Sequence, residues 1–509
     1  MNQFDTSNKN HFIFTTERLA FHILGGLSSF GLDRLRVTIK VHRNEDELHA
    51  LRHNIDLYNA NGVEKLVRKL AEFLEVGTSV IRRALQELIA KLEQHRLELL
   101  DQVELDEVEE YLLSKKERRS AMDLLKSNNL LEKTNKLIGK SGVIGEENNR
   151  LLMYLIFTSR KMNNPLHCIS FGSSGSGKTH LQSSIAELIP QEDRLSLTSL
   201  SSNSFYYFKR HELKHKLVLI EDLDGADDVL YPLRELQTKK RITKSVVQKG
   251  TGGQGTTKNL VVEGPVSVAG CTTKESIYED NSNRSFLLYI DESEEQDERI
   301  MDYQRKLSAG RVDIEQELQA EALLQNVQRL LKPVRVINPF AEALILPKSV
   351  FKPRRTNAHY LQFIEAVTFY HQHQRESKFD LHTGEEYIET TLEDIKYANQ
   401  LLKPILLRKS DNLNGATRSY FERLKTYLNK KQDSIFTNRE IRKEFRMAES
   451  THRRYQLVLQ KEGYIKRRTD IQSDSFVYEI VDVDEFGELE NSINSALSFC
   501  LEKLEEQCN

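Results

Sequence analysis

Residues 172–179 could bind a phosphate chain, because they fit the spacing G-x-x-x-x-G-K-[ST]. Glycines in such a loop let successive backbone N–H groups face the phosphates, and the N-terminus of the helix that follows adds positive potential. Lys178 would reach the β- and γ-phosphates, and the Thr179 hydroxyl would ligate Mg²⁺. The spacing therefore predicts ATP and Mg²⁺ as cofactors. The predicted nucleotide contacts are Gly172, Ser173, Ser174, Gly175, Ser176, Gly177, Lys178 and Thr179.

A second acidic group follows further along the chain, where an apolar run ends at Glu221, Asp222 and Asp224. Hydrolysis of a nucleoside triphosphate needs one carboxylate to hold Mg²⁺ and another to polarise the attacking water. We predict Glu221 as a metal ligand, and both Glu221 and Asp222 as catalytic. Because glutamate precedes aspartate here, the two roles could be exchanged, and Asp224 could share them. A strand with a solvated acidic end is the alternative.

Two further side chains could complete a catalytic site. Thr272 follows the apolar run 265–271 and could orient the attacking water near the γ-phosphate; a plain strand-end cap is the alternative. Arg284 precedes the apolar run 286–290, and an arginine in this place could act on the nucleotide of a neighbouring subunit. A surface salt bridge is the alternative for Arg284.

Alternating strand and helix patterns must position these residues. Apolar runs predict strands at 166–171, 194–200, 216–221, 265–271 and 286–290. An amphipathic helix is expected directly after the glycine loop, which argues against a simple Gly/Ser linker. The alternation predicts a parallel sheet covered by helices over residues 140–310, followed by a helical lid over 311–410.

Residues 241–262 have the pattern of a β-hairpin inserted before the strand that ends at Thr272. Its lysines, among them Lys244, Lys249 and Lys258, are suited to the phosphate backbone of DNA. A solvated hairpin with dispersed lysines is the alternative.

Residues 415–481 are predicted to form a winged helix-turn-helix. We expect its recognition helix and wing to bind DNA, with protein docking as the alternative. The DNA-binding candidates are Arg453, Arg454, Lys466, Arg467 and Arg468. The acidic tail, residues 482–509, is expected to be mobile.

The remaining sequence predicts a multidomain α/β protein. Residues 1–105 form a small α+β domain with a β-meander and two helices, and residues 106–139 form a charged helical linker. The 509 residues are 39% hydrophobic and 29% charged, with no apolar run of membrane-spanning length and no signal-peptide pattern. The four cysteines are scattered, which excludes a zinc ribbon or a disulfide framework and fits a reducing cytoplasm.

The order of these motifs resembles the AAA+ ATPase modules of bacterial and mobile-element primase–helicase proteins, distant relatives of the minichromosome-maintenance helicases. The resemblance covers about residues 140–410. It identifies the hairpin as a pre-sensor-1 hairpin and the segment 352–366 as a sensor-2 helix with Arg355 as the sensor. Residues before 140 leave no room for the zinc-ribbon and Toprim primase modules, so primer synthesis is not expected.

The resemblance implies an ATP-dependent DNA helicase or translocase in replication of a mobile element or phage. It implies a ring-forming homo-oligomer such as a hexamer, bound to single- or double-stranded DNA, with a primase encoded separately as a candidate partner and no membrane association. The alternative is an ATP-switched DNA-binding regulator or a helicase or initiator loader. A defence-system ATPase and a DNA-binding protein with an inactive nucleotide site are further alternatives.

Overall fold

The computed structural model divides the chain into two units, residues 1–112 and 113–509, and each is described by itself. None of the helices in the described part of the chain is long and apolar enough to cross a membrane. The described residues are 3–8, 10–27, 35–104, 112–197, 204–224, 230–249, 255–273, 284–413, 415–469, 476–481 and 484–508.

The first unit is an antiparallel sheet packed against two helices. Its strands are neighbours in chain order, which confirms the predicted meander. Alternate apolar side chains of the sheet are buried against the helices in one core. The elements are β1 (Gln3–Asn8), β2 (His11–Thr15), β3 (Leu19–Leu24), β4 (Arg36–Arg43), β5 (Asp46–Asp56), α1 (Ala60–Leu74) and α2 (Thr78–Glu104).

The second unit is built on a parallel five-stranded sheet, as predicted from the apolar runs. The strand order is β12-β6-β11-β8-β7, so the polypeptide crosses over rather than pairing consecutive strands. The strands are β6 (Cys168–Phe171), β7 (Arg194–Leu197), β8 (Lys216–Ile220), β11 (Val266–Thr272) and β12 (Phe286–Tyr289).

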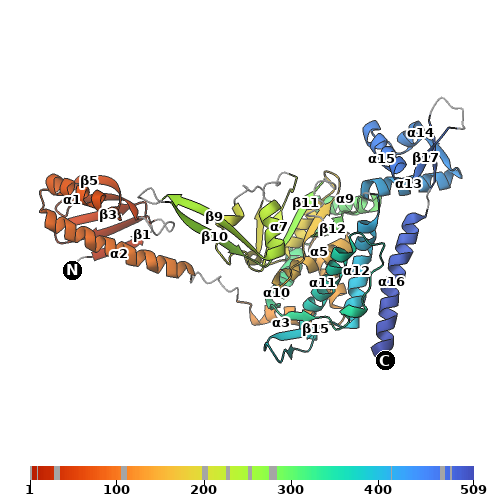
Figure 1. Ribbon diagram of the computed structural model, residues 1–509, viewed down its shortest axis with the longest axis horizontal. Coiled ribbons are helices and arrows are strands. Elements are labelled where there is room, and N and C mark those ends of the chain that lie inside the picture. The colour runs from red at the N-terminus through yellow and green to blue at the C-terminus, as the bar shows by residue number, and fades with distance from the viewer. Residues whose placement is uncertain are drawn as a thin grey trace. The chain divides into compact units, whose positions relative to one another are not determined.

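Helices cover both faces of this sheet (Figure 1). One face packs with α5 (Glu147–Thr158) and α6 (Lys178–Glu187) into the largest core of the protein. The other face packs with α7 (Leu230–Lys239) and with the base of the hairpin formed by β9 (Arg241–Lys249) and β10 (Gly255–Glu263). The hairpin strands extend beyond the parallel sheet (Figure 1).

The segment predicted as a charged linker, residues 106–139, is part of the second unit from residue 113 onward. Its helices α3 (Lys115–Leu125) and α4 (Leu130–Lys140) bury one apolar face each in the main core, against α10 (Ile314–Leu330). The expected helices are present, but the role of a linker is wrong for this part, because the many charged residues lie on the solvent faces of amphipathic helices.

The lid region contains α10, α11 (Pro353–Tyr370) and α12 (Leu392–Ser410), as the helical pattern predicted. Helix α9 (Glu294–Ser308), directly before it, was not predicted. A small sheet was not predicted: β13 (Arg335–Ile337), β14 (Lys378–Phe379) and β15 (Glu386–Glu389), in the order β13-β15-β14. Its strands are two to four residues long, too short to give a clear alternating pattern.

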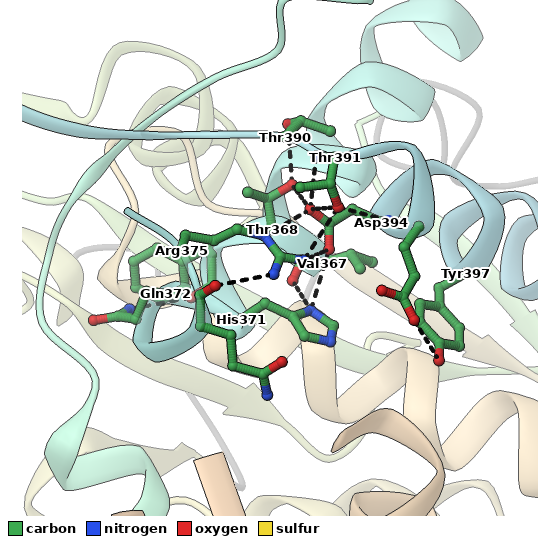
Figure 2. A network of polar contacts seen from close by, with 12 residues as sticks. Val367, Thr368, His371, Gln372, Arg375, Thr390, Thr391, Asp394 and Tyr397 are labelled. Carbon is green, nitrogen blue, oxygen red and sulfur yellow. Dashed lines mark hydrogen bonds and ion pairs between the residues drawn. The ribbon is translucent and has the colours of Figure 1, made fainter. Parts of the chain in front are cut away.

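A buried polar network joins α11 to α12 around Asp394, whose side chain is fully buried (Figure 2). Arg375 donates to both Asp394 carboxylate oxygens, at 2.5 and 3.3 Å. The Thr368 hydroxyl donates to the same carboxylate at 3.1 Å, and Asp394 also forms a capping box with Thr391. The network satisfies a charge that would otherwise be costly to bury, and so fixes the lid helices to each other.

Residues 482–509 were predicted to be a mobile tail, and that expectation is wrong. The described part forms α16 (Glu485–Cys508), which lies along α12 (Figure 1). Ile493, Leu497, Cys500 and Leu504 are buried in the main core, at a spacing that puts them on one helix face. Because the segment is rich in acidic residues, its overall composition did not reveal this apolar stripe.

Residues 415–481 have a separate hydrophobic core. The predicted helices are present, and a three-stranded sheet of order β16-β18-β17 closes the fold. The elements are α13 (Gly415–Lys431), β16 (Ile435–Thr437), α14 (Asn438–Glu444), α15 (Glu449–Lys461), β17 (Ile465–Arg468) and β18 (Val477–Ile480).

Candidate nucleotide site

The glycine loop connects β6 directly to α6, which is the arrangement that the spacing predicted. Gly175 and Gly177 have φ angles of 85° and 90°, a conformation that residues with a side chain rarely adopt. A Cβ atom on Gly172 would lie 2.5 Å from the Ser176 hydroxyl, so the backbone must approach closely here. The loop therefore has the tight, glycine-dependent turn that a phosphate-binding loop requires.

Polar groups of this loop fit a bound polyphosphate. Lys178 is buried and donates from Nζ to the carbonyl oxygens of Gly172 and Ser173, at 2.9 and 2.5 Å. The Ser176 hydroxyl is buried and has no hydrogen-bond partner among the described residues. Glu292 places a carboxylate oxygen 2.6 Å from the Ser173 backbone nitrogen. Because the Glu292 carboxylate accepts a hydrogen bond from the Ser173 N–H, the N–H groups of the loop are suited to bind an anion.

Strand register brings Thr272 and the acidic residues to the same edge as the loop. Strand β11 lies between β6 and β8, and Thr272 pairs with Phe171, the residue before the loop. On the other side Gly270 pairs with Ile220, so Thr272 is level with Asp222. Since all three strands are parallel, their carboxyl ends place Lys178, Thr272 and Glu221 along one edge.

Asp224 accepts hydrogen bonds from both threonines at the end of β11. Its carboxylate accepts from the hydroxyl of Thr272, and also from the hydroxyl and backbone N–H of Thr273, at 2.8 and 3.2 Å. Asp222 in turn accepts from the Asp224 backbone N–H at 2.8 Å. Hydrogen bonds therefore connect the acidic turn, residues 221–224, to the two threonines at the end of β11.

Cys271 lies beneath this site, on the same strand as Thr272. Its thiol donates to the Gln182 side-chain oxygen, and Gln182 donates to the Ile220 carbonyl oxygen. Burial raises the pKa of the Cys271 thiol to about 11. It stays a neutral thiol, and Gln182 connects α6 both to this strand and to the end of β8.

Arg284 and Arg355 lie at the opposite edge of the sheet. Arg284 stands just before β12, whose Phe286 pairs with Cys168 at the start of β6, and Arg355 is in the first turn of α11. Both line one cavity of about 260 Å³, and Arg284 also donates to the Thr238 hydroxyl at 2.8 Å. The two arginines thus lie together, away from the loop of their own chain.

The arginine cavity favours an anion. None of the described residues that line it is acidic. His167 and His359 also line it, and burial, together with nearby cationic groups, lowers the pKa of each to about 3. The same causes lower the pKa of the adjacent Lys409 to about 8. Positive charge is therefore crowded among the described residues that line this cavity.

The predicted DNA contacts divide into groups with different surroundings. Lys244 lies over the Tyr206 ring at 5.3 Å. Lys249 and Lys258 belong to the two hairpin strands, but their side chains lie outside the described residues.

Of the cations in residues 415–481, Arg453 and Arg454 are exposed on α15 and line a hollow of about 740 Å³. Lys466 and Arg467 are exposed on β17, and Arg467 stacks on Phe476 at 3.5 Å. Arg468 instead donates to Glu479 at 2.6 Å, so it has a structural partner within the small sheet.

The sequence did not reveal one candidate functional residue, and it indicated only a minor role for another. Glu292 contacts the loop although it follows β12, far along the chain, and no local pattern marks it. Asp224 was considered only as a residue that could share the roles of Glu221 and Asp222, whereas it accepts hydrogen bonds from Thr272 and Thr273. Strand order decides both contacts, and the linear sequence does not show strand order.

Comparison with known proteins gives one family match. The family described as the MTBMA_p00010 P-loop domain matches residues 113–333, which include the loop, the acidic turn and Thr272. An "Uncharacterized protein MTBMA_p00010" of Methanothermobacter marburgensis is 24% identical over 313 residues, 58% of this chain. The match spans 38% of that relative's length.

Three solved structures are similar over parts of the chain. An MCM homolog from Methanopyrus kandleri has a TM-score of 0.37 and 13% identity, covering 58% of this chain and 62% of its own. Drosophila ORC bound to DNA has a TM-score of 0.22 and 11% identity, covering 73% and 92%.

The C-terminal region of NrS-1 has a TM-score of 0.22 and 13% identity, covering 70% of this chain and 78% of its own. The assignment of the fold rests instead on the parallel sheet, the loop geometry and the family match. Residues 113–333 match a P-loop domain family, and they contain the glycine loop between β6 and α6.

Proposed function

We propose that this protein is an ATP-dependent DNA helicase or translocase of the AAA+ type, acting in DNA replication of a mobile element or phage. The observation that carries the proposal is the continuity of two elements. Strand β10 of the lysine-bearing hairpin ends at Glu263, and β11 begins at Val266 and ends at Thr272 beside the loop. A shift of Thr272 would therefore be transmitted along one strand to the hairpin.

The residues at the carboxyl edge have separate tasks in this proposal. Lys178 and the loop N–H groups bind the phosphates of ATP, and Thr179 and Glu221 hold Mg²⁺. Bound Mg²⁺ neutralises charge on the β- and γ-phosphates. Asp222 orients and polarises the attacking water, and Thr272 contacts the γ-phosphate. Asp224 is a positioning residue, because it acts through Thr272.

Arg284 and Arg355 complete the site of a neighbouring subunit. They lie together at the edge of the sheet opposite the loop, so neither is placed to reach the nucleotide of its own chain. An arginine supplied by a neighbour stabilises charge in the transition state and can contribute about 10³–10⁵ in rate. The proposal thus requires a homo-oligomer, with a hexameric ring as the expected form.

DNA contacts are assigned to two places. The hairpin lysines Lys244, Lys249 and Lys258 bind the phosphate backbone and move with the nucleotide state. Residues 415–481 act as a winged helix, in which Arg453 and Arg454 on α15 and Lys466 and Arg467 on β17 contact DNA. A primase encoded separately is a candidate partner.

Strand separation on a forked duplex tests the proposal. The full chain should unwind the fork with ATP, and Lys249→Ala/Lys258→Ala should lose unwinding while keeping ATP binding. Lys214→Ala/Lys348→Ala is a matched control that removes two lysines elsewhere in the same unit. Unwinding unchanged in the hairpin variant, or equal loss in both variants, would contradict the assigned role of the hairpin.

A second candidate is an ATP-switched DNA-binding regulator or loader. It is favoured by the hollow along α15, where Arg453 and Arg454 lie beside Glu449 and Ser450. Side chains at the start of such a helix can contact base edges. Footprinting separates the candidates, because a discrete protected sequence without unwinding supports the regulator and weak protection along any sequence supports the motor.

A further inference from the structure

Two histidines and a glutamate form a compact group on the N-terminal sheet, far from the P-loop domain in the sequence. His22 lies on β3, His42 on β4 and Glu47 on β5. One ligand atom from each residue lies within 4.8 Å of the other two. The adjacent side chains Phe21 and Val41 enter the core with α1 and α2, so by alternation His22 and His42 lie on the other face.

Hydrogen bonds hold the two rings in position to share a ligand. Nε2 of His22 and Nε2 of His42 are 2.9 Å apart. Two nitrogen ligands of one tetrahedral zinc ion, each at about 2.1 Å, lie roughly 3.4 Å apart, so a small movement would admit an ion. His42 Nδ1 lies 2.7 Å from the Arg43 carbonyl oxygen. This contact assigns the proton to Nδ1 and leaves a lone pair on Nε2.

A break in strand register brings Glu47 to the histidines. His42 pairs with Ala50, but the next residue, Arg43, pairs with Asp46, so residues 47–49 form a bulge in β5. Bulges re-aim side chains that a regular strand would place elsewhere. Here the bulge brings the carboxylate of Glu47 to the same face as His22 and His42.

Two neighbours complete the surroundings. His11 on β2 places Nε2 at 2.9 Å from Nδ1 of His22, which is the place of an outer partner that orients a ligating ring. Lys40 donates to Glu47 at 3.1 Å, so a bound ion would have to replace this ammonium group as the partner of the carboxylate.

We propose that Nε2 of His22, Nε2 of His42 and the carboxylate of Glu47 bind a divalent transition-metal ion such as zinc. Two imidazoles and one carboxylate are a known zinc donor set that leaves a fourth position open. When the ion binds Nε2 of His22, the proton of this ring shifts from Nε2 to Nδ1. The Nδ1–H of His22 then donates a hydrogen bond to Nε2 of His11, whose own proton lies on Nδ1. Both rings stay neutral, so no net proton is released.

Zinc affinity of the full chain, measured by competition with a chromophoric chelator, tests this site. The unaltered protein should bind one zinc ion at this site. Glu47→Gln should weaken binding by about 100-fold or more, because even outer partners contribute about 10–100-fold. Glu47 is largely exposed, so its replacement should not affect folding. His11→Ala should weaken binding about 10–100-fold, and Lys40→Met should strengthen it.

His53→Gln is the matched control, because His53 pairs with Ile39 on the core face of the same sheet. Its zinc affinity should equal that of the unaltered protein. Cobalt replacing zinc should give the visible absorption of a tetrahedral site, lost in Glu47→Gln. Three results would overturn the proposal: no zinc binding, binding unaffected by Glu47→Gln, or binding lost only in Thr179→Val, which would assign the ion to the P-loop.

Discussion

Replacing Asp224 with alanine should separate nucleotide binding from hydrolysis. The carboxylate of Asp224 accepts three hydrogen bonds, from the Thr272 hydroxyl and from the hydroxyl and N–H of Thr273. Hydrogen bonds to a charged group contribute about 1.5–3 kcal/mol each, and less where they are exposed. Because Thr273 is exposed, we expect the free energy of unfolding to fall by about 2–4 kcal/mol.

Loss of Asp224 should also lower the rate of hydrolysis. Thr272 is 1% exposed, and without Asp224 its hydroxyl must turn to another acceptor. A displacement of about 1 Å in a positioning group can lower turnover about 100-fold, which is about 2.7 kcal/mol of barrier. The affinity for ATP should stay unchanged, because the contacts of Lys178 with the loop carbonyl oxygens do not involve Asp224.

Steady-state hydrolysis and binding of a fluorescent ATP analogue measure the two effects on one preparation. Thr273→Ala is the control, since it removes one donor and leaves Thr272 bonded to Asp224, and its turnover should fall no more than a few-fold. Turnover of Asp224→Ala within twofold of the unaltered protein would refute the positioning role. Equal loss of turnover in Thr273→Ala would also refute it.

Three further predictions concern other parts of the P-loop unit. Lys178→Ala and Arg284→Ala should each abolish hydrolysis. Mixing the two variants should restore part of the activity, because one chain supplies the loop and the other supplies the arginine. Mixtures that stay inactive would argue against a site shared between subunits. Arg375→Met should lower the free energy of unfolding by about 3–5 kcal/mol, because it leaves the buried Asp394 carboxylate without its cation. A denaturant titration measures this loss. The explanation would be contradicted if the double variant Arg375→Met/Asp394→Asn were as unstable as Arg375→Met. His167, with its pKa lowered to about 3, stays neutral in the folded protein but takes up a proton below about pH 6.5 in the unfolded chain. The free energy of unfolding should therefore fall by about 2 kcal/mol as the pH drops toward 5. In thermal melts, His167→Gln should lose less stability over the same pH range.

The sequence predicted the parts of this protein that depend on local pattern. The five core strands, the loop between β6 and α6 and the N-terminal meander are all present. Each is specified by apolar runs or glycine spacing within about ten residues. The family match over residues 113–333 agrees with the loop motif.

The errors arose where amphipathic helices have many charged residues. Helices α3 and α4 were predicted as a charged helical linker and α16 as a mobile tail, but each buries a narrow apolar stripe. In α16 that stripe includes Ile493, Leu497 and Leu504, in a helix that also has many charged and polar residues. Average composition hides such a stripe, and only the helical period reveals it.

Long-range contacts at the candidate site could not be predicted. Arg284 and Arg355 share a cavity because α11 begins beside the start of β12, and Glu292 reaches the loop from the end of that strand. The group of His22, His42 and Glu47 depends on strand pairing and on a bulge in β5. Residues that are far apart in sequence and brought together by strand order have no local pattern.

The rate of ATP hydrolysis with and without DNA tests the central claim most directly. It should be measured on the full chain with single-stranded DNA, with duplex DNA and without nucleic acid, beside Lys178→Ala as the inactive reference. The account predicts hydrolysis that rises at least about 10-fold with DNA and falls to background in Lys178→Ala, because the hairpin strand β10 leads into the strand of Thr272. Hydrolysis at the same rate in all three conditions, or hydrolysis that persists in Lys178→Ala, would contradict it.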